Sequence, residues 1–231
     1  MVKNLILLSQ KLKKMDLRNN ILIRQIYFRL RNFLEKRSYS FGKNNIKSFK
    51  GVNVNNRIHV HGSNNKIETH TGSVVKNCLI HMQGNNNSII IKEKACVSGA
   101  ELWLEGNGCI IEIGENTFVG HHSHLACTEE ECKLILGNDC MLSSYVQVRT
   151  GDSHSILNLN KERLNKAESV YIGDHCWLGE GCKILKGVKL DKDIVVSTGA
   201  IVTKSFKKNV LLGGIPAKII KEEITWDSKR L

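Results

Sequence analysis

Residues 170–206 read VYIGDHCWLGEGCKILKGVKLDKDIVVSTGAIVTKSF, and this stretch decides the fold. Aliphatic residues recur in it at every sixth position: Ile172, Leu178, Ile184, Leu190, Val196 and Val202. A small or apolar residue follows four positions after each of them: Cys176, Cys182, Val188, Ile194, Ala200 and Phe206. A helix repeats about every 3.6 residues and a strand about every two, so neither explains a period of six. The period predicts an all-β solenoid, a parallel β-helix with three flat faces, in which each aliphatic residue points inward and stacks on the one eighteen positions away.

A second periodicity extends the solenoid toward the N-terminus, with longer corners. Three phrases rich in Gly and Asn begin at Gly62, Gly84 and Gly106, which are 22 residues apart. Gly and Asn tolerate left-handed backbone conformations, so these phrases mark corners and the isoleucines after them begin strands. We therefore expect the solenoid to occupy residues 51–212.

One interruption of the repeat is much larger than the others. Related blocks begin at Ile111, Leu134 and Val170, with offsets of 23 and then 36 residues. The second offset places an excursion at residues 149–169, and its sequence is polar and out of register. Because loops that leave a rigid scaffold often carry the chemistry, this excursion is a candidate for the active site.

Basic charge is concentrated at the N-terminus. The 231-residue chain has a formal net charge of +12, and residues 1–50 hold thirteen Lys and Arg but only two acidic residues. Ile23, Ile26 and Leu30 share one helical face, so we expect residues 1–50 to form a basic amphipathic helical segment. Residues 1–40 could contact an anionic membrane surface or an acidic polymer, or pack on a neighbouring subunit, and both interpretations stay open. No nucleic-acid partner is expected.

Composition fits a folded solenoid, because 41% of the residues are hydrophobic and only one is proline. Eight cysteines occur without a secretory signal, and several fill small-residue positions of the repeat. We expect reduced, structural thiols in a cytoplasmic protein, which would be peripheral at the inner membrane face if the basic segment contacts a membrane. Residues 213–231 begin with GGIPAK, and we expect them to form a short helical cap over the open end of the solenoid.

Residues 173–221 resemble the hexapeptide-repeat acyltransferases. The resemblance rests on the phrase IGDHCWLG, the unbroken hexapeptides, the VTK at 202–204 and the GIPAK of the cap. The Asn-rich coils and the stretch from Cys140 to His154 look most like the bacterial capsule-polysaccharide O-acetyltransferases, including those that act on polymers of sialic acid. The resemblance covers about residues 55–226. It implies a left-handed parallel β-helix, a homotrimer, acetyl-coenzyme A as donor and a saccharide, such as an anionic polysaccharide, as acceptor.

Acetyl transfer to a sugar hydroxyl needs a base, because an alcohol is a poor nucleophile at neutral pH. Histidine suits this role because its pKa lies near the working pH. In the resembling family the base is a histidine on the loop that leaves the solenoid, and His154 is the one histidine of nine that falls in the excursion. We predict His154 as the general base. Asp152 could orient its imidazole, although a backbone carbonyl would serve as well.

The resemblance also implies residues for the acceptor. Trp177 replaces the polar outward residue of its hexapeptide, and in the family a tryptophan here lines the acceptor site beside the thioester. The alternative is an aromatic residue at the trimer interface. His122 is expected to border the acceptor groove, together with Tyr145 and Arg149.

For the donor, the resemblance points to positions near the C-terminal coils. The backbone amide of Gly179 is a candidate to stabilise the negative charge that develops on the thioester oxygen. Thr198 sits where a small residue borders the pantetheine arm of the coenzyme. The remaining positions match coenzyme A contacts of the family: Thr203, Lys204, Lys218 and Lys221.

Other functions remain to be weighed. The acceptor could be an amino sugar, which would make the protein an N-acetyltransferase, or the solenoid could bind a polymer without catalysis. A γ-type carbonic anhydrase shares the solenoid, but His121, His122 and His124 lack the spacing of its zinc ligands. We therefore expect an O-acetyltransferase that uses no metal.

Overall fold

The computed structural model describes residues 23, 26 and 38–229. Of the predicted N-terminal helical segment, residues 1–37 lie outside these residues apart from Ile23 and Ile26, whereas residues 38–50 contain strands rather than a helix. The helical structure of residues 1–37 and the contact with a membrane through residues 1–40 therefore stay predictions. In the part of the chain that is described, no helix has the length and apolar character needed to cross a membrane.

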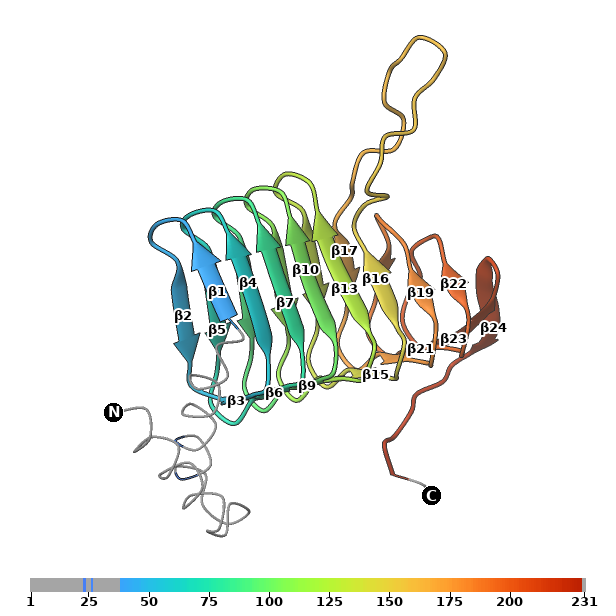
Figure 1. Ribbon diagram of the computed structural model, residues 1–231. Coiled ribbons are helices and arrows are strands. Elements are labelled where there is room, and N and C mark those ends of the chain that lie inside the picture. The colour runs from blue at the N-terminus through green and yellow to red at the C-terminus, as the bar shows by residue number, and fades with distance from the viewer. Residues whose placement is uncertain (1–22, 24–25, 27–37, 230–231) are drawn as a thin grey trace.

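Three sheets, each mostly parallel, form the three faces of a prism (Figure 1). The first face contains, in order, β1 (Ser38–Phe41), β4 (Arg57–His61), β7 (Leu79–Gln83), β10 (Glu101–Glu105), β13 (His124–Thr128), β16 (Gln147–Arg149), β19 (Lys183–Ile184) and β22 (Ile201–Val202). The second face contains β2 (Ile46–Phe49), β5 (Lys66–Thr69), β8 (Ser88–Ile91), β11 (Ile110–Ile113), β14 (Lys133–Leu136), β17 (Val170–Ile172) and β20 (Lys189–Leu190). The third face contains β3 (Val52–Val54), β6 (Val74–Lys76), β9 (Cys96–Ser98), β12 (Phe118–Val119), β15 (Met141–Leu142), β18 (Trp177–Leu178), β21 (Ile194–Val196), β23 (Val210–Gly214) and β24 (Ala217–Glu222).

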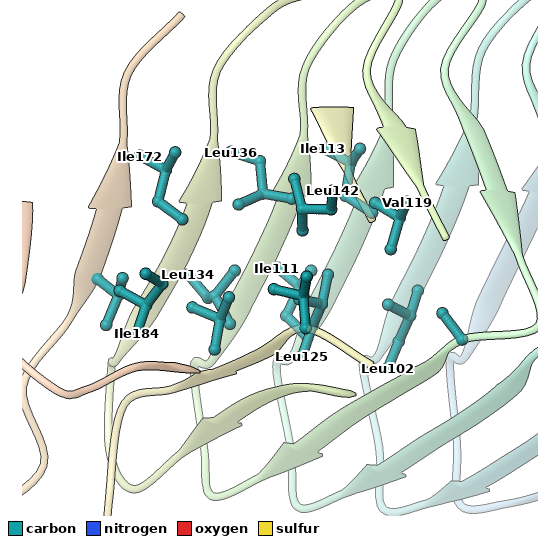
Figure 2. Packing of buried hydrophobic residues seen from close by; sticks show 14 of the residues in the cluster. Leu102, Ile111, Ile113, Val119, Leu125, Leu134, Leu136, Leu142, Ile172 and Ile184 are labelled. Atoms are coloured by element: carbon teal, nitrogen blue, oxygen red, sulfur yellow. The ribbon is translucent and has the colours of Figure 1, made fainter. Parts of the chain in front are cut away.

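The core is a set of inward-facing aliphatic stacks, as the period of six predicts. Three pairs eighteen residues apart lie opposite each other in neighbouring parallel strands: Ile172 and Leu190, Leu178 and Val196, and Ile184 and Val202. All six side chains are at most 3% exposed. Figure 2 shows the same stacking in the middle coils, where Leu102 pairs with Leu125. The predicted parallel β-helix is therefore confirmed.

The corners explain why the early repeats are rich in Gly and Asn. The amide of Asn87 donates to the side-chain oxygen of Asn65 at 3.0 Å, and the amide of Cys109 donates to that of Asn87 at 2.8 Å. At Gly62, where φ is +118°, a Cβ atom would lie 2.0 Å from the carbonyl oxygen of Gly84. A side chain has no room there, so glycine is required and the next coil can approach closely.

The excursion leaves the solenoid between β16 and β17 and projects away from the body of the prism (Figure 1). Strand pairing continues across it, because Leu134 pairs with Val170 and Val148 pairs with Ile184. Both pairs are 36 residues apart, so the chain re-enters the repeat in register after the excursion. The excursion is thus an insertion into one coil that leaves the stacks of the core unbroken.

Two expectations about the ends need correction. The solenoid begins at β1 rather than at residue 51, since Ser38–Phe41 pairs with β4 and Ile46–Phe49 pairs with β5. The C-terminal cap is a β-hairpin rather than a helix, because β24 lies antiparallel to β23. The physical reason is that the last coil presents an edge of unpaired backbone groups, which an added strand can pair and a helix cannot.

All eight cysteines are free thiols, and seven of them are buried. They act as compact apolar filling between the stacks, as their positions in the repeat indicated. Burial raises the pKa of the Cys78 thiol to about 11 and that of Cys182 to about 12. Both are therefore protonated at neutral pH, which suits a structural role.

Candidate active site

His154 lies exposed on the first arm of the excursion. The two arms meet in an antiparallel bridge between Leu157 and Arg163, so the excursion has the form of an irregular hairpin. At its base, Nη2 of Arg149 donates to the hydroxyl of Ser153 at 2.8 Å. His154 is thus accessible to a molecule that approaches from solvent.

A nearly buried asparagine joins the two arms beside His154. The side chain of Asn165 donates to the backbone carbonyl of His154 at 2.8 Å and to the carboxylate of Asp152 at 2.9 Å. Its oxygen accepts from the amide of Ile156 at 2.7 Å. Asn165 therefore satisfies groups on both sides of His154 in the chain, which fixes the backbone that carries the imidazole.

Two ion pairs fasten the excursion to the solenoid. Arg163 forms two hydrogen bonds with the carboxylate of Glu129, a residue that follows β13, and this guanidinium lowers the pKa of Glu129. Lys186 follows β19 and pairs with Asp152, and the hydrogen bonds from Lys186 and then Asn165 lower the pKa of that carboxyl. Such charge-assisted bonds are stronger than neutral ones. The excursion is therefore anchored at both of its ends.

Asp152 has other partners in this structure, so its expected role beside His154 stays a prediction. Its carboxylate bonds to the side chains of Lys186 and Asn165 rather than to the imidazole of His154. The chain bends between Asp152 and His154, where Ser153 has a φ of +67°, and Lys186 offers the carboxylate a charged partner. Asp152 thus anchors the excursion.

Replacing Asn165 by alanine is expected to loosen the excursion while leaving the solenoid intact. The change removes four hydrogen bonds, and if two of them contribute about 1 kcal/mol each, local opening becomes roughly thirtyfold more frequent. Hydrogen exchange of the amides between Gly151 and Glu168 measures this opening. Asn160→Ala, at the exposed tip of the same excursion, is the matched control. Equal exchange in the two variants would contradict the clamp.

The third face carries an outward column of large apolar side chains. Phe118, Met141 and Trp177 lie in register on β12, β15 and β18. The indole nitrogen of Trp177 donates to the hydroxyl of Ser143 at 3.4 Å. Trp226, from the segment after β24, lies against this column with its ring centroid 5.9 Å from that of Trp177. The predicted acceptor residue therefore sits in an aromatic cluster.

His122 and Tyr145 lie together at the corner between the third and first faces. Their rings stack at 4.9 Å with an angle of 17° between the planes. Both residues have positive φ values, near 60°, because each occupies the same corner position in successive coils. Arg149 lies on the first face at the base of the excursion instead. The structure thus brings His122 and Tyr145 together, whereas Arg149 lies at the base of the excursion that carries His154.

Gly179 lies where two successive coils approach closely. Its backbone amide donates to the carbonyl of Val196 at 2.8 Å, within the ladder that joins successive coils. A Cβ atom at this position would lie 2.7 Å from the amide nitrogen of Thr198, which explains the glycine. Its role as oxyanion donor stays a prediction.

The expected donor-binding residues fall into two groups. Thr198 is exposed at the corner that follows β21, next to Gly179. Thr203 and Lys204 follow β22 at another corner, while Lys218 and Lys221 lie exposed on β24. A hollow of about 540 Å³ between residues 204–210 and β24 includes Lys204 in its wall. The last coil therefore gathers several lysines, which are suitable partners for phosphate groups.

Within one chain, the structure keeps His154 and Trp177 apart. His154 stands on the excursion that leaves the corner between the first and second faces, whereas Trp177 lies on the third face. In Figure 1 the excursion projects from one side of the prism, and β15 and β21, which flank β18 in the third face, lie on the opposite side.

Sequence reasoning missed several residues that shape these regions. Asn165, Arg163 and Glu129 belong to no motif, since single polar residues in loops are common. The only available signal was a pair of opposite charges, one before the excursion and one within it. Trp226 had a clearer signal, because an aromatic residue near the C-terminus is available to fold back on the prism. His175 belongs to the quoted IGDHCWLG phrase, but its contact with Trp226 depends on the path of the tail.

Comparison with known proteins relates this geometry to function. No protein-family model matches the chain. The solved structure of the polysialic acid O-acetyltransferase OatWY superposes with a TM-score of 0.78 and 31% identity, over 84% of this chain and 92% of that chain. The chain belongs to the hexapeptide-repeat acyltransferase family. Its parallel solenoid supports the left-handed β-helix that the resemblance implies.

This hexapeptide-repeat acyltransferase lies close to the capsule O-acetyltransferases. A polysialic acid O-acetyltransferase from Neisseria meningitidis is 34% identical over 123 residues, which are 52% of this chain and 56% of that protein. A polysialic acid O-acetyltransferase from Escherichia coli O1:K1 is 30% identical over 115 residues, which are 49% of this chain and 37% of that protein. In these alignments the acyltransferase described here spans only part of each relative's length.

Proposed function

We propose that the protein is an O-acetyltransferase that moves an acetyl group from acetyl-coenzyme A to a hydroxyl of a capsular or other surface polysaccharide, or of its sugar precursor. The observation that carries the proposal is the single large interruption of a regular solenoid. It holds a solvent-exposed His154 on a backbone that Asn165 and two ion pairs fix in place. The similarity to polysialic acid O-acetyltransferases supports the same reaction class.

In this proposal His154 is the general base. An unprotonated imidazole nitrogen accepts the proton of the acceptor hydroxyl as the hydroxyl oxygen forms a bond to the acetyl carbon. The same nitrogen then donates this proton to the coenzyme A sulfur as the bond between sulfur and acetyl carbon breaks. Acetyl-coenzyme A, when bound, supplies the activated acetyl group as a thioester. The exposed lysines of the last coil, Lys204, Lys218 and Lys221, fit the phosphates of such a donor, and Thr198 fits its narrow arm.

We further propose that the active site forms between copies of the chain in a homotrimer. His154 and Trp177 lie on different parts of one prism, so a shared site needs the excursion of one copy and the third face of its neighbour. A cyclic trimer repeats such a contact three times. This arrangement also places the excursion of a neighbouring copy beside Trp177, at the end of the outward column.

Mixed trimers test the shared site. His154→Ala and Trp177→Ala chains with different affinity tags are co-expressed, and trimers that carry both tags are isolated. In every mixed trimer one of the three junctions pairs an intact His154 with an intact Trp177, so we expect about one third of the wild-type rate of acetyl transfer. Each variant alone should be nearly inactive. Mixed trimers no more active than the parent variants would refute a site shared between copies.

A further inference from the structure

A hollow of about 590 Å³ lies at the corner between the second and third faces, beside Trp177. Phe118 and Met141 form its apolar wall, and the C-terminal segment forms the opposite wall with Trp226. Its volume falls within the range of about 300–1,000 Å³ that is usual for small-molecule sites. The reaction proposed above uses Trp177 but assigns nothing to this hollow.

The tail that closes the hollow is held in place by specific contacts. The indole nitrogen of Trp226 donates to the backbone carbonyl of His175 at 2.8 Å. The indole also stacks on the imidazole of His175, with ring centroids 4.6 Å apart and planes 10° apart. That imidazole is fixed in turn by Asp193, whose carboxylate lies 2.8 Å from Nδ1. Trp226 is therefore positioned before any ligand arrives, which reduces the entropy that binding costs.

The chemistry of the lining suits a sugar ring. A pyranose has an apolar face of C–H groups and a rim of hydroxyls. Phe118 and Trp226 offer aromatic surface for the C–H face. Asn116, Asp139 and Asp227 offer an amide and two carboxylates at the edge of the same hollow, and a carboxylate accepts strong hydrogen bonds from hydroxyls.

The charge of the lining narrows the class of sugar. Two carboxylates, those of Asp139 and Asp227, line the hollow, and among the described residues that line it there is no lysine or arginine. Like charges in a partly enclosed site repel each other more strongly than in bulk water. A sugar that carries its own carboxylate would therefore be rejected, while an uncharged sugar would keep its hydroxyl contacts.

We propose that this hollow is an acceptor subsite that holds an uncharged pyranose unit next to Trp177, with Trp226 as its aromatic platform. The proposal rests on the proposed acetyl transfer, since it names the sugar class of that acceptor. It distinguishes this chain from its named relatives, whose acceptor is the anionic polysialic acid.

Binding of oligosaccharides to the full-length protein, without any donor, tests the subsite. Maltotetraose, chitotetraose and a β-linked galactotetraose serve as uncharged probes, and tetrasialic acid serves as the anionic probe, with affinity measured by titration calorimetry. We expect at least one uncharged probe to bind and tetrasialic acid to bind at least tenfold more weakly. Failure of all three uncharged probes at millimolar concentration, or preference for tetrasialic acid, would overturn the proposal.

Three variants locate the binding. Trp226→Ala should weaken binding of the uncharged probe about tenfold through loss of aromatic contact, and Trp103→Ala, on the first face, should leave it unchanged. Asp139→Asn combined with Asp227→Asn keeps the shape of the site and should reduce the discrimination against tetrasialic acid. If Trp226→Ala leaves the affinity for the probe unchanged but alters the mass of the oligomeric assembly, a neighbouring copy occupies the hollow and the subsite is refuted.

The outcome is separable from that of the proposed reaction. His154→Ala should bind the uncharged probe with wild-type affinity, because His154 is not part of the lining of the hollow and binding without donor needs no proton transfer. If wild-type protein binds the probe through Trp226 but transfers no acetyl group to any saccharide, the reaction fails and the subsite stands. If acetyl transfer occurs but Trp226→Ala changes neither binding nor KM, the subsite fails alone.

Discussion

Replacing His154 by alanine should lower kcat for acetyl transfer by about 10²–10⁴-fold, the usual contribution of a general base. The acceptor hydroxyl would then have to lose its proton to water, while the surfaces that bind donor and acceptor stay as they are. KM should therefore change much less than kcat. A steady-state assay with labelled acetyl-coenzyme A and a polysaccharide panel measures both constants.

The control for this prediction lies on the same excursion. Leu159 is fully exposed at its tip, so Leu159→Ala alters the loop without touching the base or its clamp. We expect Leu159→Ala to keep wild-type kcat. A rate within a factor of about two of wild type in His154→Ala would remove the base from the mechanism.

Replacing Leu125 by alanine should lower the free energy of unfolding by about 2–5 kcal/mol. Leu125 is 0% exposed and lies in register between Leu102 and Val148, so its loss opens a cavity in the middle of a stack (Figure 2). Neighbouring coils can close little of that cavity, because backbone hydrogen bonds fix the spacing between strands. Urea unfolding followed by circular dichroism measures the change.

Leu159→Ala is again the matched control, because it deletes the same atoms from a side chain that is 104% exposed rather than 0% exposed. Its free energy of unfolding should stay within about 0.5 kcal/mol of wild type. Similar destabilisation by the two substitutions would mean that the inward stack does not carry the stability of the solenoid.

Periodic features could be predicted from the sequence because a solenoid repeats one local rule. Ile172 and Leu190 are eighteen residues apart in the chain, and the same interval brings them side by side in neighbouring strands. The offset of 36 residues located the excursion for the same reason. The first coil could also have been found, since Gly42 begins a Gly-Lys-Asn-Asn phrase twenty residues before the one at Gly62.

Features that depend on side-chain direction or on the path of an irregular segment could not be predicted in the same way. Asp152 lies two residues from His154, but sequence distance does not reveal that its carboxylate pairs with Lys186, which lies 34 residues after Asp152. The contact of Trp226 with His175 spans 51 residues and belongs to no repeat. The sequence of β24, AKIIKE, has no clear period, so nothing in it contradicted the expectation of a helix.

The uninterrupted register on either side of the excursion makes this loop an exchangeable part. Strand pairing of β14 with β17 and of β16 with β19 is the same as if the inserted residues were absent. Lengthening a surface loop costs little free energy, since the entropy of closing it grows only slowly with its length. Such a chain can acquire a different loop without any change to the stacks that keep the prism folded.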